Sequence, residues 1–178
     1  MDAHYTFETL ISEEELAAKV SELGAAITRD YKDKDTVFVG ILKGSFIFMA
    51  DLLRRVHLER LAMDFMMVSS YGSGTVSSGN VRIKKDLEQD IAGKHVLIVE
   101  DIVDSGNTLT YLKRFLATRK PASVKVVTML DKPSRREVPL VPDYCGFEIP
   151  DAFVVGCGLD YDQRYRELKD ICVLHFIG

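Results

Sequence analysis

The chain has 178 residues, of which 47% are hydrophobic and 28% are charged, so it can build the core of one ordinary soluble domain. This composition excludes a disordered chain, a collagen-like repeat and a small disulfide-stapled scaffold. The net charge of −4 argues against a protein that holds nucleic acid by general electrostatics. A few placed lysines and a metal ion can still hold a phosphate on such a chain.

The cysteines and the apolar stretches indicate the compartment. Cys145, Cys157 and Cys172 are too few and too scattered for a disulfide framework or a four-ligand zinc site, and this usage fits a reducing cytosol. The first residues lack the pattern of a signal peptide, and no apolar stretch approaches the roughly 20 residues that cross a bilayer. We therefore expect a soluble cytoplasmic protein with no membrane partner.

A helix is the first predicted element. Ser12 and Glu15 form a capping box, and Ile11 and Leu16 stand at the positions of a hydrophobic staple. Gly24 is expected to end the first long helical run. The role of this helix is expected to be structural packing.

Strands and helices then alternate. Short apolar runs predict strands over 36–41, 60–69, 95–99, 124–130 and 171–176. A helix follows the first of these strands, with Phe46, Ala50 and Leu53 on its apolar face, and another follows the third, marked by Leu109, Leu112 and Leu116. This alternation predicts an α/β fold with a mostly parallel sheet flanked by helices.

Ligands of such sheets bind beyond the carboxyl ends of the strands, near a topological switch point. Three turns are therefore candidates, over 42–45, 100–108 and 131–135. Two stretches break the alternation. Residues 69–80 are rich in glycine and serine, as in a functional lid or a disordered connector, and residues 133–150 are expected to form a small irregular subdomain.

The turn after the strand at 95–99 carries the most informative chemistry. Three carboxylates follow Val99 within five residues, and a Ser-Gly-Asn-Thr turn then opens a helix. The amides of a helix N-terminus suit a phosphate, and adjacent carboxylates suit a sugar diol or Mg²⁺. The plainer alternative is that Asp104 or Ser105 only caps the helix. The position of the acids at a strand end favours a site, and the run is no Walker loop, because it lacks Gly-Lys-Ser/Thr.

Five motifs occur in one order along the chain: Leu42-Lys43-Gly44, residues 69–72, residues 99–108, Asp131-Lys132 and residues 146–161. Together they resemble the motifs of the type I phosphoribosyltransferases, and the match to the hypoxanthine/guanine branch covers nearly the whole chain. The resemblance implies the fold of that family as a single domain over 1–178. A small irregular hood would come from the N-terminal segment and about 133–178.

The resemblance implies a set of residues that bind the donor, phosphoribosyl pyrophosphate. Glu100 and Asp101 would face the ribose hydroxyls and a magnesium ion, and Asp160 would bind a second magnesium. The 5′-phosphate would lie against Ser105, Gly106, Asn107 and Thr108. Pyrophosphate would meet Lys43, Gly44 and Arg166, and the Leu42–Lys43 peptide bond is often cis in the family.

The purine side is also implied by the resemblance. Asp104 would manage the proton at N7 as the acid–base group, and Lys43 would be the other catalytic residue. Lys132 would donate to O6, and Phe153, Val154 and Asp160 would complete the purine site. Taken alone, Phe153 would be assigned to the core. Ser70 and Tyr71 would lie on a lid that closes over the reaction.

The implied reaction is purine salvage, in which the 5-phosphoribosyl group passes to N9 of hypoxanthine or guanine, giving IMP or GMP and releasing pyrophosphate. A xanthine-preferring enzyme and a nucleotide-responsive RNA-binding regulator on the same fold remain alternatives, as does a phospho-acceptor receiver domain. The net charge and the retained Lys43 and Lys132 argue against the regulator, so no nucleic-acid partner is expected. We expect a homodimer or homotetramer. Because its acids gather in one cleft, the protein should require Mg²⁺.

Overall fold

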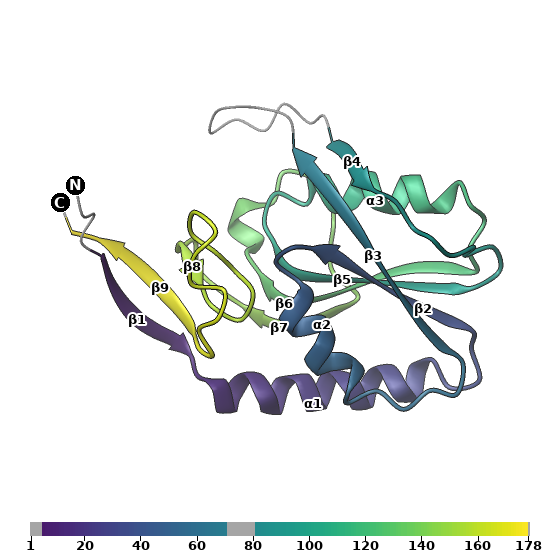
Figure 1. Ribbon diagram of the computed structural model, residues 1–178, viewed down its shortest axis with the longest axis horizontal. Helices are drawn as coiled ribbons and strands as arrows, with labels where there is room; N and C mark the ends of the chain where they lie inside the picture. The colour runs from purple at the N-terminus through teal and green to yellow at the C-terminus, as the bar shows by residue number, and fades with distance from the viewer. Residues whose placement is uncertain (1–4, 71–80, 178) are drawn as a thin grey trace.

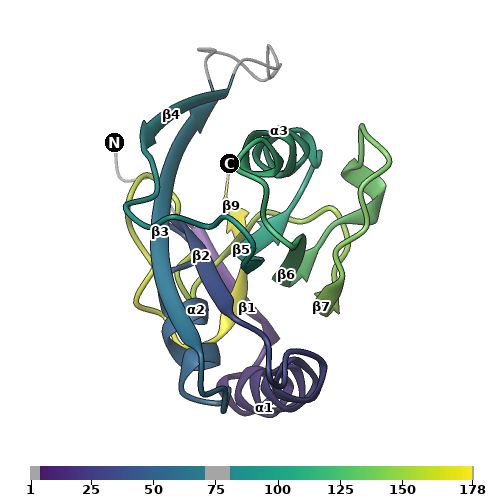
Figure 2. The same ribbon diagram turned by 90° about the vertical axis from the view of Figure 1, so that its right-hand side faces the viewer.

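The computed structural model describes residues 5–70 and 81–177, which form a large sheet with helices on both faces and a small second sheet (Figures 1 and 2). The large sheet has the order β4-β3-β2-β5-β6-β7. Its strands are β2 (Thr36–Leu42), β3 (Leu61–Ser70), β4 (Val81–Lys85), β5 (His95–Val103), β6 (Ser123–Asp131) and β7 (Tyr144–Glu148). All neighbouring pairs are parallel except β3 and β4. The predicted mostly parallel sheet flanked by helices is confirmed.

The second sheet joins segments from opposite parts of the sequence. It contains β1 (Tyr5–Ile11), β9 (Ile171–Phe176) and β8 (Val154–Val155), all antiparallel, in the order β1-β9-β8. Figure 1 shows it beside the large sheet, with both ends of the chain at its outer end. The strand predicted at 171–176 therefore exists but pairs with β1. It follows an irregular segment, and without a crossover helix the chain does not return parallel to the large sheet.

Helices cover both faces of the large sheet. They are α1 (Glu13–Asp30), α2 (Phe46–Leu53) and α3 (Asn107–Ala117), and a short 3-10 turn, η1, spans Pro133–Arg135. Side chains alternate along each strand, so Phe38 packs with α1 and α2 whereas Val39 packs with α3. Figure 2 shows α1 and α3 on opposite sides of the strands. None of the helices in the described ranges is long and apolar enough to cross a membrane.

The start of α1 follows the sequence prediction and its end does not. The Ser12 amide donates to Glu15 Oε2 at 2.8 Å and the Glu15 amide donates to Ser12 Oγ at 3.3 Å, which completes the capping box. The expected end at Gly24 is wrong, because α1 continues to Asp30. A Cβ atom at Gly24 would lie 2.7 Å from Arg55 Cβ, so this glycine permits close packing inside a continuing helix.

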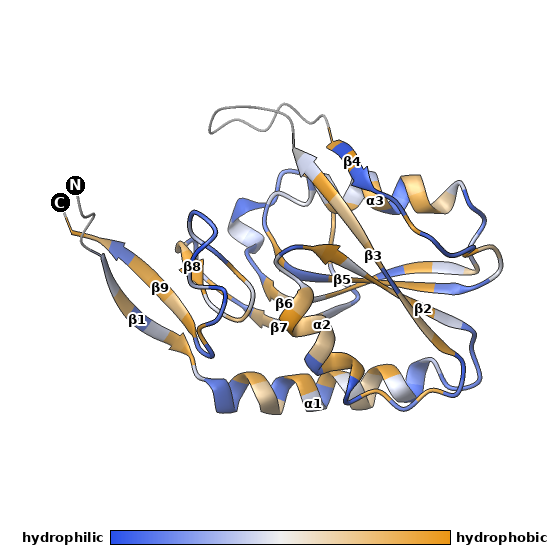
Figure 3. Ribbon diagram, viewed as in Figure 1, coloured by the Kyte–Doolittle hydropathy of each residue, from blue (hydrophilic) through white to orange (hydrophobic). Residues whose placement is uncertain are grey.

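The buried face of α2 was predicted wrongly. Phe46 is 43% exposed and Ala50 is also exposed, while Phe48, Met49 and Leu52 are buried. Every residue of this helix except Asp51 is apolar, and Figure 3 shows most of α2 as hydrophobic. Periodicity cannot select a buried face when nearly all faces are apolar.

The strands of the large sheet differ from the prediction in three places. β5 extends past the predicted end at Val99 to Val103, because its pairing with β2 stops at Val99 but its pairing with β6 continues to Val103. Strands β4 and β7 were not predicted. Tyr144–Glu148 lies inside the segment expected to be irregular, yet it pairs parallel with β6.

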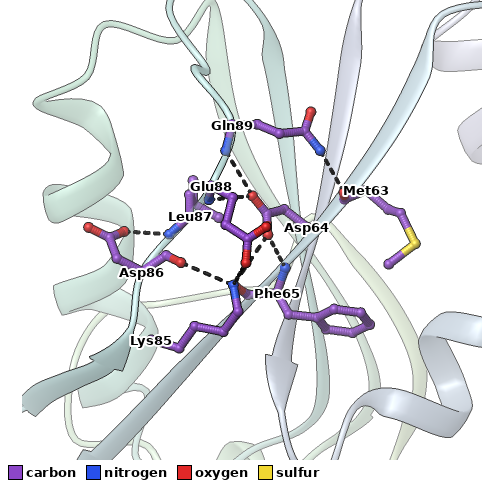
Figure 4. A network of polar contacts seen from close by, with 8 residues as sticks. All are labelled: Met63, Asp64, Phe65, Lys85, Asp86, Leu87, Glu88 and Gln89. Carbon is purple, nitrogen blue, oxygen red and sulfur yellow. Dashed lines mark hydrogen bonds and ion pairs between the residues drawn. The ribbon is translucent and has the colours of Figure 1, made fainter.

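Asp64 fastens the chain between β4 and β5 to β3 (Figure 4). Its carboxylate accepts the backbone amides of Phe65 at 2.7 Å, Glu88 at 2.8 Å and Gln89 at 3.1 Å, and Lys85 Nζ lies 3.7 Å away. Burial by itself would raise the pKa of Asp64, but these donors outweigh burial and lower the pKa. Asp64 is thus a buried charge whose partners are all supplied by the fold.

The strand order locates a topological switch. From β2 the sheet continues to β3 on one side, and on the other side it runs through β5, β6 and β7. A crevice is therefore expected beyond the carboxyl ends of β2 and β5. In Figure 1 the arrowhead of β2 points toward the side of the molecule that carries the small sheet. The turns after β2, β5 and β6 lie at this edge, as the sequence predicted.

Candidate active site

The turn after β2 is enclosed between strand β5 and the loop after β8. A Cβ atom at Gly44 would lie 1.7 Å from Asp101 Oδ2, and a Cβ atom at Gly158, where φ is +98°, would lie 2.1 Å from the Gly44 carbonyl oxygen. Both glycines are needed for this close approach. The Leu42–Lys43 peptide bond is cis, as the resemblance implied. The structure thus brings Gly44 and Asp101 into contact across the switch point.

Glu100 and Asp101 are partly buried near the end of β5. Burial raises the pKa of Glu100, and the charge of Asp101 raises it further. Burial also raises the pKa of Asp101, although the Ile102 amide donates to its Oδ1 at 2.7 Å and Arg166 lies near enough to oppose the shift. In contrast to Asp64, the hydrogen bonds and charges around these two acids do not outweigh the effect of burial.

The turn at the start of α3 opens onto a cleft. Gly106 precedes the helix with a φ of +83°, and the Asn107 amide donates to Ser105 Oγ at 3.3 Å. The cleft has a volume of about 240 Å³. Its lining includes Glu100, Asp104, Ser105, Gly106 and Thr108. The side chain of Asn107 is bonded instead to Glu137, with 2.6 Å between Nδ2 and Oε2. Acids and an amide-rich helix start therefore share one cleft.

A polar cluster joins the turn after β2 to the loop before β9. Gln163 Oε1 accepts from Lys43 Nζ at 3.0 Å and from Arg166 Nη2 at 3.2 Å. Arg166 also pairs with Asp160 at 2.9 Å and donates to the Gly158 carbonyl at 2.7 Å. The structure brings Lys43, Arg166 and Asp160 together, and it adds Gln163, which the sequence did not suggest.

A chain of charges links the two predicted purine-contacting residues Asp104 and Lys132. Lys132 is only 7% exposed, and its Nζ lies 4.0 Å from Asp151 Oδ1. Arg135 lies 3.7 Å from the other oxygen of Asp151, and its Nε donates to Asp104 Oδ1 at 3.2 Å. Asp104 and Lys132 therefore belong to one continuous charged group.

Phe153 lies at the surface and not in the core. Its ring is 46% exposed and meets Tyr161 edge-to-face at a centroid distance of 5.7 Å. Val154, the next residue, is buried in β8. An exposed aromatic ring is suited to contact with a planar base. Of the predicted lid residues, Ser70 ends β3, and Tyr71 lies outside the described residues.

Comparisons with known proteins identify the family. A family model described as "Phosphoribosyl transferase domain" matches residues 8–162. The chain belongs to the phosphoribosyltransferase family. Hypoxanthine-guanine phosphoribosyltransferase of Bacillus subtilis is 53% identical to it over 174 residues, which are 98% of this chain and 96% of that protein. Hypoxanthine phosphoribosyltransferase of Escherichia coli K12 is 55% identical over 169 residues, 94% of each chain.

A solved structure agrees with these relatives. The crystal structure of a hypoxanthine phosphoribosyltransferase from Staphylococcus aureus has a TM-score of 0.91 and 50% identity, and the match covers 94% of this chain and 90% of that chain. This phosphoribosyltransferase thus falls in the hypoxanthine/guanine branch. The predictions of the fold, of a pentosyl-transferring enzyme and of a purine-salvage function are confirmed.

Several residues at the site of this phosphoribosyltransferase were not singled out from the sequence. They are Arg135, Arg136, Glu137 and Gln163. The first three form a charged run that begins three residues after Lys132, and this run could have drawn attention to them. Gln163 stands in a tight turn where its φ is +65°, and no sequence pattern marks it.

Proposed function

We propose that the cleft at the ends of β2 and β5 carries out the transfer of the 5-phosphoribosyl group from phosphoribosyl pyrophosphate to N9 of hypoxanthine or guanine. One observation carries the residue assignments. The acids Glu100 and Asp104 line one cleft together with the anion-binding start of α3, so one ligand with a diol and a phosphate can meet both. The products are IMP or GMP and pyrophosphate.

The cations on the far side of the switch point suit the leaving group. Transfer at C1′ passes through an oxocarbenium-like state as the pyrophosphate departs. Lys43 and Arg166 converge on Gln163 Oε1, so both side chains already point to one place where phosphate oxygens can replace the amide oxygen. The Gly44 backbone approaches closely because no side chain blocks it. These residues would neutralise the developing charge.

The acid pair fits a magnesium ion. Glu100 and Asp101 offer hard oxygen ligands, and burial raises the pKa of both, an effect that a bound cation would oppose. The described residues hold no group of three or more such side chains that could enclose a metal. That agrees with Mg²⁺, which usually takes one or two carboxylates and completes its shell with substrate and water oxygens. When bound, Mg²⁺ would neutralise charge on the donor and its leaving group. Asp160 is the proposed ligand of a second ion.

Asp104 and Lys132 divide the work on the base. Asp104 would hold the proton at N7 while N9 attacks, which is ordinary acid–base work for a carboxylate. Lys132 Nζ would donate to O6, and it would oppose the amino group that adenine carries there. A site built around one such hydrogen bond can reject the unmatched analogue by about 10⁴-fold or more. Phe153 would stack on the ring, and Val154 would contact it through the backbone.

The assignment is tested with a spectrophotometric assay containing phosphoribosyl pyrophosphate and one base at a time. We expect turnover of hypoxanthine and guanine with Mg²⁺, little with adenine and a large loss after chelation. Faster turnover of xanthine than of either base would transfer the assignment to a xanthine-preferring enzyme. In the same assay Lys132→Ala should raise the KM for the purine more than that for the donor, and unchanged purine selectivity would contradict its role.

We also propose a cytoplasmic homodimer or homotetramer built from single-domain subunits. The hood would come from the N-terminal segment and about 133–178. Three cysteines with free thiols support a reducing compartment. Sedimentation equilibrium on the purified protein tests the subunit number, and a mass equal to one chain at micromolar concentration would contradict an oligomer.

A further inference from the structure

The segment after β6 is fastened to the loop after β5 by direct bonds. Two of these bonds are between backbone atoms: the Lys132 amide donates to the Val103 carbonyl at 2.9 Å, and the Glu137 amide donates to the Ser105 carbonyl at 3.0 Å. Two involve side chains: Arg136 Nη1 donates to the Asp104 carbonyl at 2.8 Å, and Asn107 Nδ2 donates to Glu137 Oε2 at 2.6 Å. The first segment carries the proposed O6 donor. The second carries the proposed acid–base group and phosphate turn, so these bonds join two halves of the site.

Arg136 makes one of these links with a largely buried side chain. It is 14% exposed, and while Nη1 reaches the Asp104 carbonyl, Nη2 pairs with Asp131, which is 8% exposed. Asp131 is the last residue of β6 and pairs with Val103 of β5. Arg136 therefore spans from a fixed strand end to the turn between β5 and α3. A guanidinium can make both contacts at once because its donors form a rigid fork.

The electrostatic role of Arg136 toward a substrate is small. Asp131 neutralises its charge at close range, so the pair adds no net positive field at the phosphate turn. The contribution that remains is geometric, because a carbonyl held by Arg136 fixes the main chain of Asp104. Arg135 holds the carboxylate of the same residue. Consecutive arginines thus hold Asp104 by its main chain and by its side chain.

We propose that Arg136 is a positioning residue that sets the place of Asp104 and the phosphate turn relative to the purine-reading segment. The proposal rests on the proposed function of these residues. It assigns to the buried Asp131–Arg136 pair an effect on the reaction in addition to its effect on folding. A displacement of about 1 Å in such a constellation can cost about a hundredfold in rate.

Arg136→Lys separates the two roles. Lysine can keep a charge beside Asp131, but it presents one ammonium group and cannot hold the Asp104 carbonyl in the same fork. We expect kcat to fall roughly 10- to 100-fold and the KM for phosphoribosyl pyrophosphate to rise several-fold. The KM for hypoxanthine should change less than about twofold, since Lys132 stays fixed by β6. Arg119→Lys, which alters another arginine–aspartate pair, with Asp86, is the matched control. It should behave as the wild type.

A second variant addresses folding. Asp131→Asn with Arg136→Gln removes both charges and keeps hydrogen-bonding groups, so it avoids an unpaired buried charge. As in Arg136→Lys, we expect a lower kcat and a higher KM for the donor in this double variant, with little change in the KM for the purine. A folded variant with wild-type kinetic constants would overturn the proposal, as would a fall in kcat matched by loss of folded protein with both KM values unchanged. Wild-type turnover is measured alongside, so failure of the proposed function is seen separately.

Discussion

Two sets of partly or fully buried carboxylates on one sheet differ in how the fold treats them. Asp64 on β3 accepts three backbone amides and lies near Lys85, and its pKa is lowered. Glu100 and Asp101 on β5 stand side by side, and burial raises the pKa of each. The fold itself supplies the partners of Asp64, whereas the proposed partners of Glu100 and Asp101 are a metal ion and the donor.

The largest expected effect is a loss of activity on substitution of Asp101, which would distinguish the acids on β5 from Asp64. Asp101→Asn should lower kcat/KM by roughly a hundredfold or more, because loss of this proposed ligand of the metal and the ribose removes about 3 kcal/mol of transition-state stabilisation. Steady-state assays with saturating Mg²⁺ measure this. Glu59→Gln removes a negative charge from an exposed position before β3 and serves as the control. A loss of kcat/KM below threefold in Asp101→Asn would contradict the functional role that separates Asp101 from Asp64.

Asp64→Asn should have its effect on stability instead. The asparagine cannot accept all of the amide bonds with the strength of a carboxylate, so we expect the free energy of unfolding to fall by about 2 kcal/mol. Urea denaturation at neutral pH gives the value. The kcat of the folded variant at 25 °C should stay within about twofold of the wild type, since Phe65, Glu88, Gln89 and Lys85, which bind the Asp64 carboxylate, do not line the cleft. A large loss of kcat in Asp64→Asn with an unchanged free energy of unfolding would contradict a structural role for Asp64.

The difference in stability between the wild type and Asp64→Asn should depend on pH. Because the pKa of Asp64 is lowered in the folded state, its contribution is fully present above its unfolded pKa of about 3.9 and is lost as pH falls through the folded pKa. The urea midpoints of the wild type and Asp64→Asn, measured between pH 7 and pH 3, should therefore differ by a constant amount down to about pH 4. Below pH 4 the difference should shrink. A gap that widens on acidification would contradict the assigned sign.

The smallest effect concerns the free protein. Asp101→Asn relieves repulsion beside Glu100. In the absence of Mg²⁺ and substrate, its free energy of unfolding should therefore equal that of the wild type or exceed it by up to about 1 kcal/mol. Added Mg²⁺ with phosphoribosyl pyrophosphate should stabilise the wild type and Asp64→Asn, because ligands that bind the native state shift unfolding, but should stabilise Asp101→Asn much less. Marked destabilisation of free Asp101→Asn would show that Asp101 also supports the fold.

The sequence predicted best those features that are local in the chain. The capping box at Ser12, the strand–helix alternation and the run from Glu100 to Thr108 each lie within one short segment. Pairing was harder to predict, because β4 and β7 are short and lie at the two edges of the large sheet, and β9 finds its partner at the other end of the sequence. Contacts such as Gly44 with Gly158 depend on two loops meeting, and no periodicity reports that.

The candidate site divides in the same way. The motif residues were placed by resemblance, and the structure brings Lys43, Arg166 and Asp160 into one cluster. Gln163 at its centre was missed, because one glutamine in a turn carries no pattern. Phe153, which alone would have been placed in the core, is exposed, since it directly precedes the short strand β8 at the margin of the small sheet.

The small sheet also orders events during synthesis. All strands of the large sheet have been made once Glu148 is added, but β8 next to Phe153 pairs only with β9, where Val154 faces Val173. β9 in turn pairs with β1, the first strand to be made. Tyr5 thus lies opposite Phe176, although the two residues come from opposite ends of the sequence. A nascent chain that ends at Glu148 therefore has the phosphate turn and Lys132, but it still lacks both the cluster around Arg166 and the small sheet next to Phe153. The proposed sites for both substrates are thus complete only after β9 has been added.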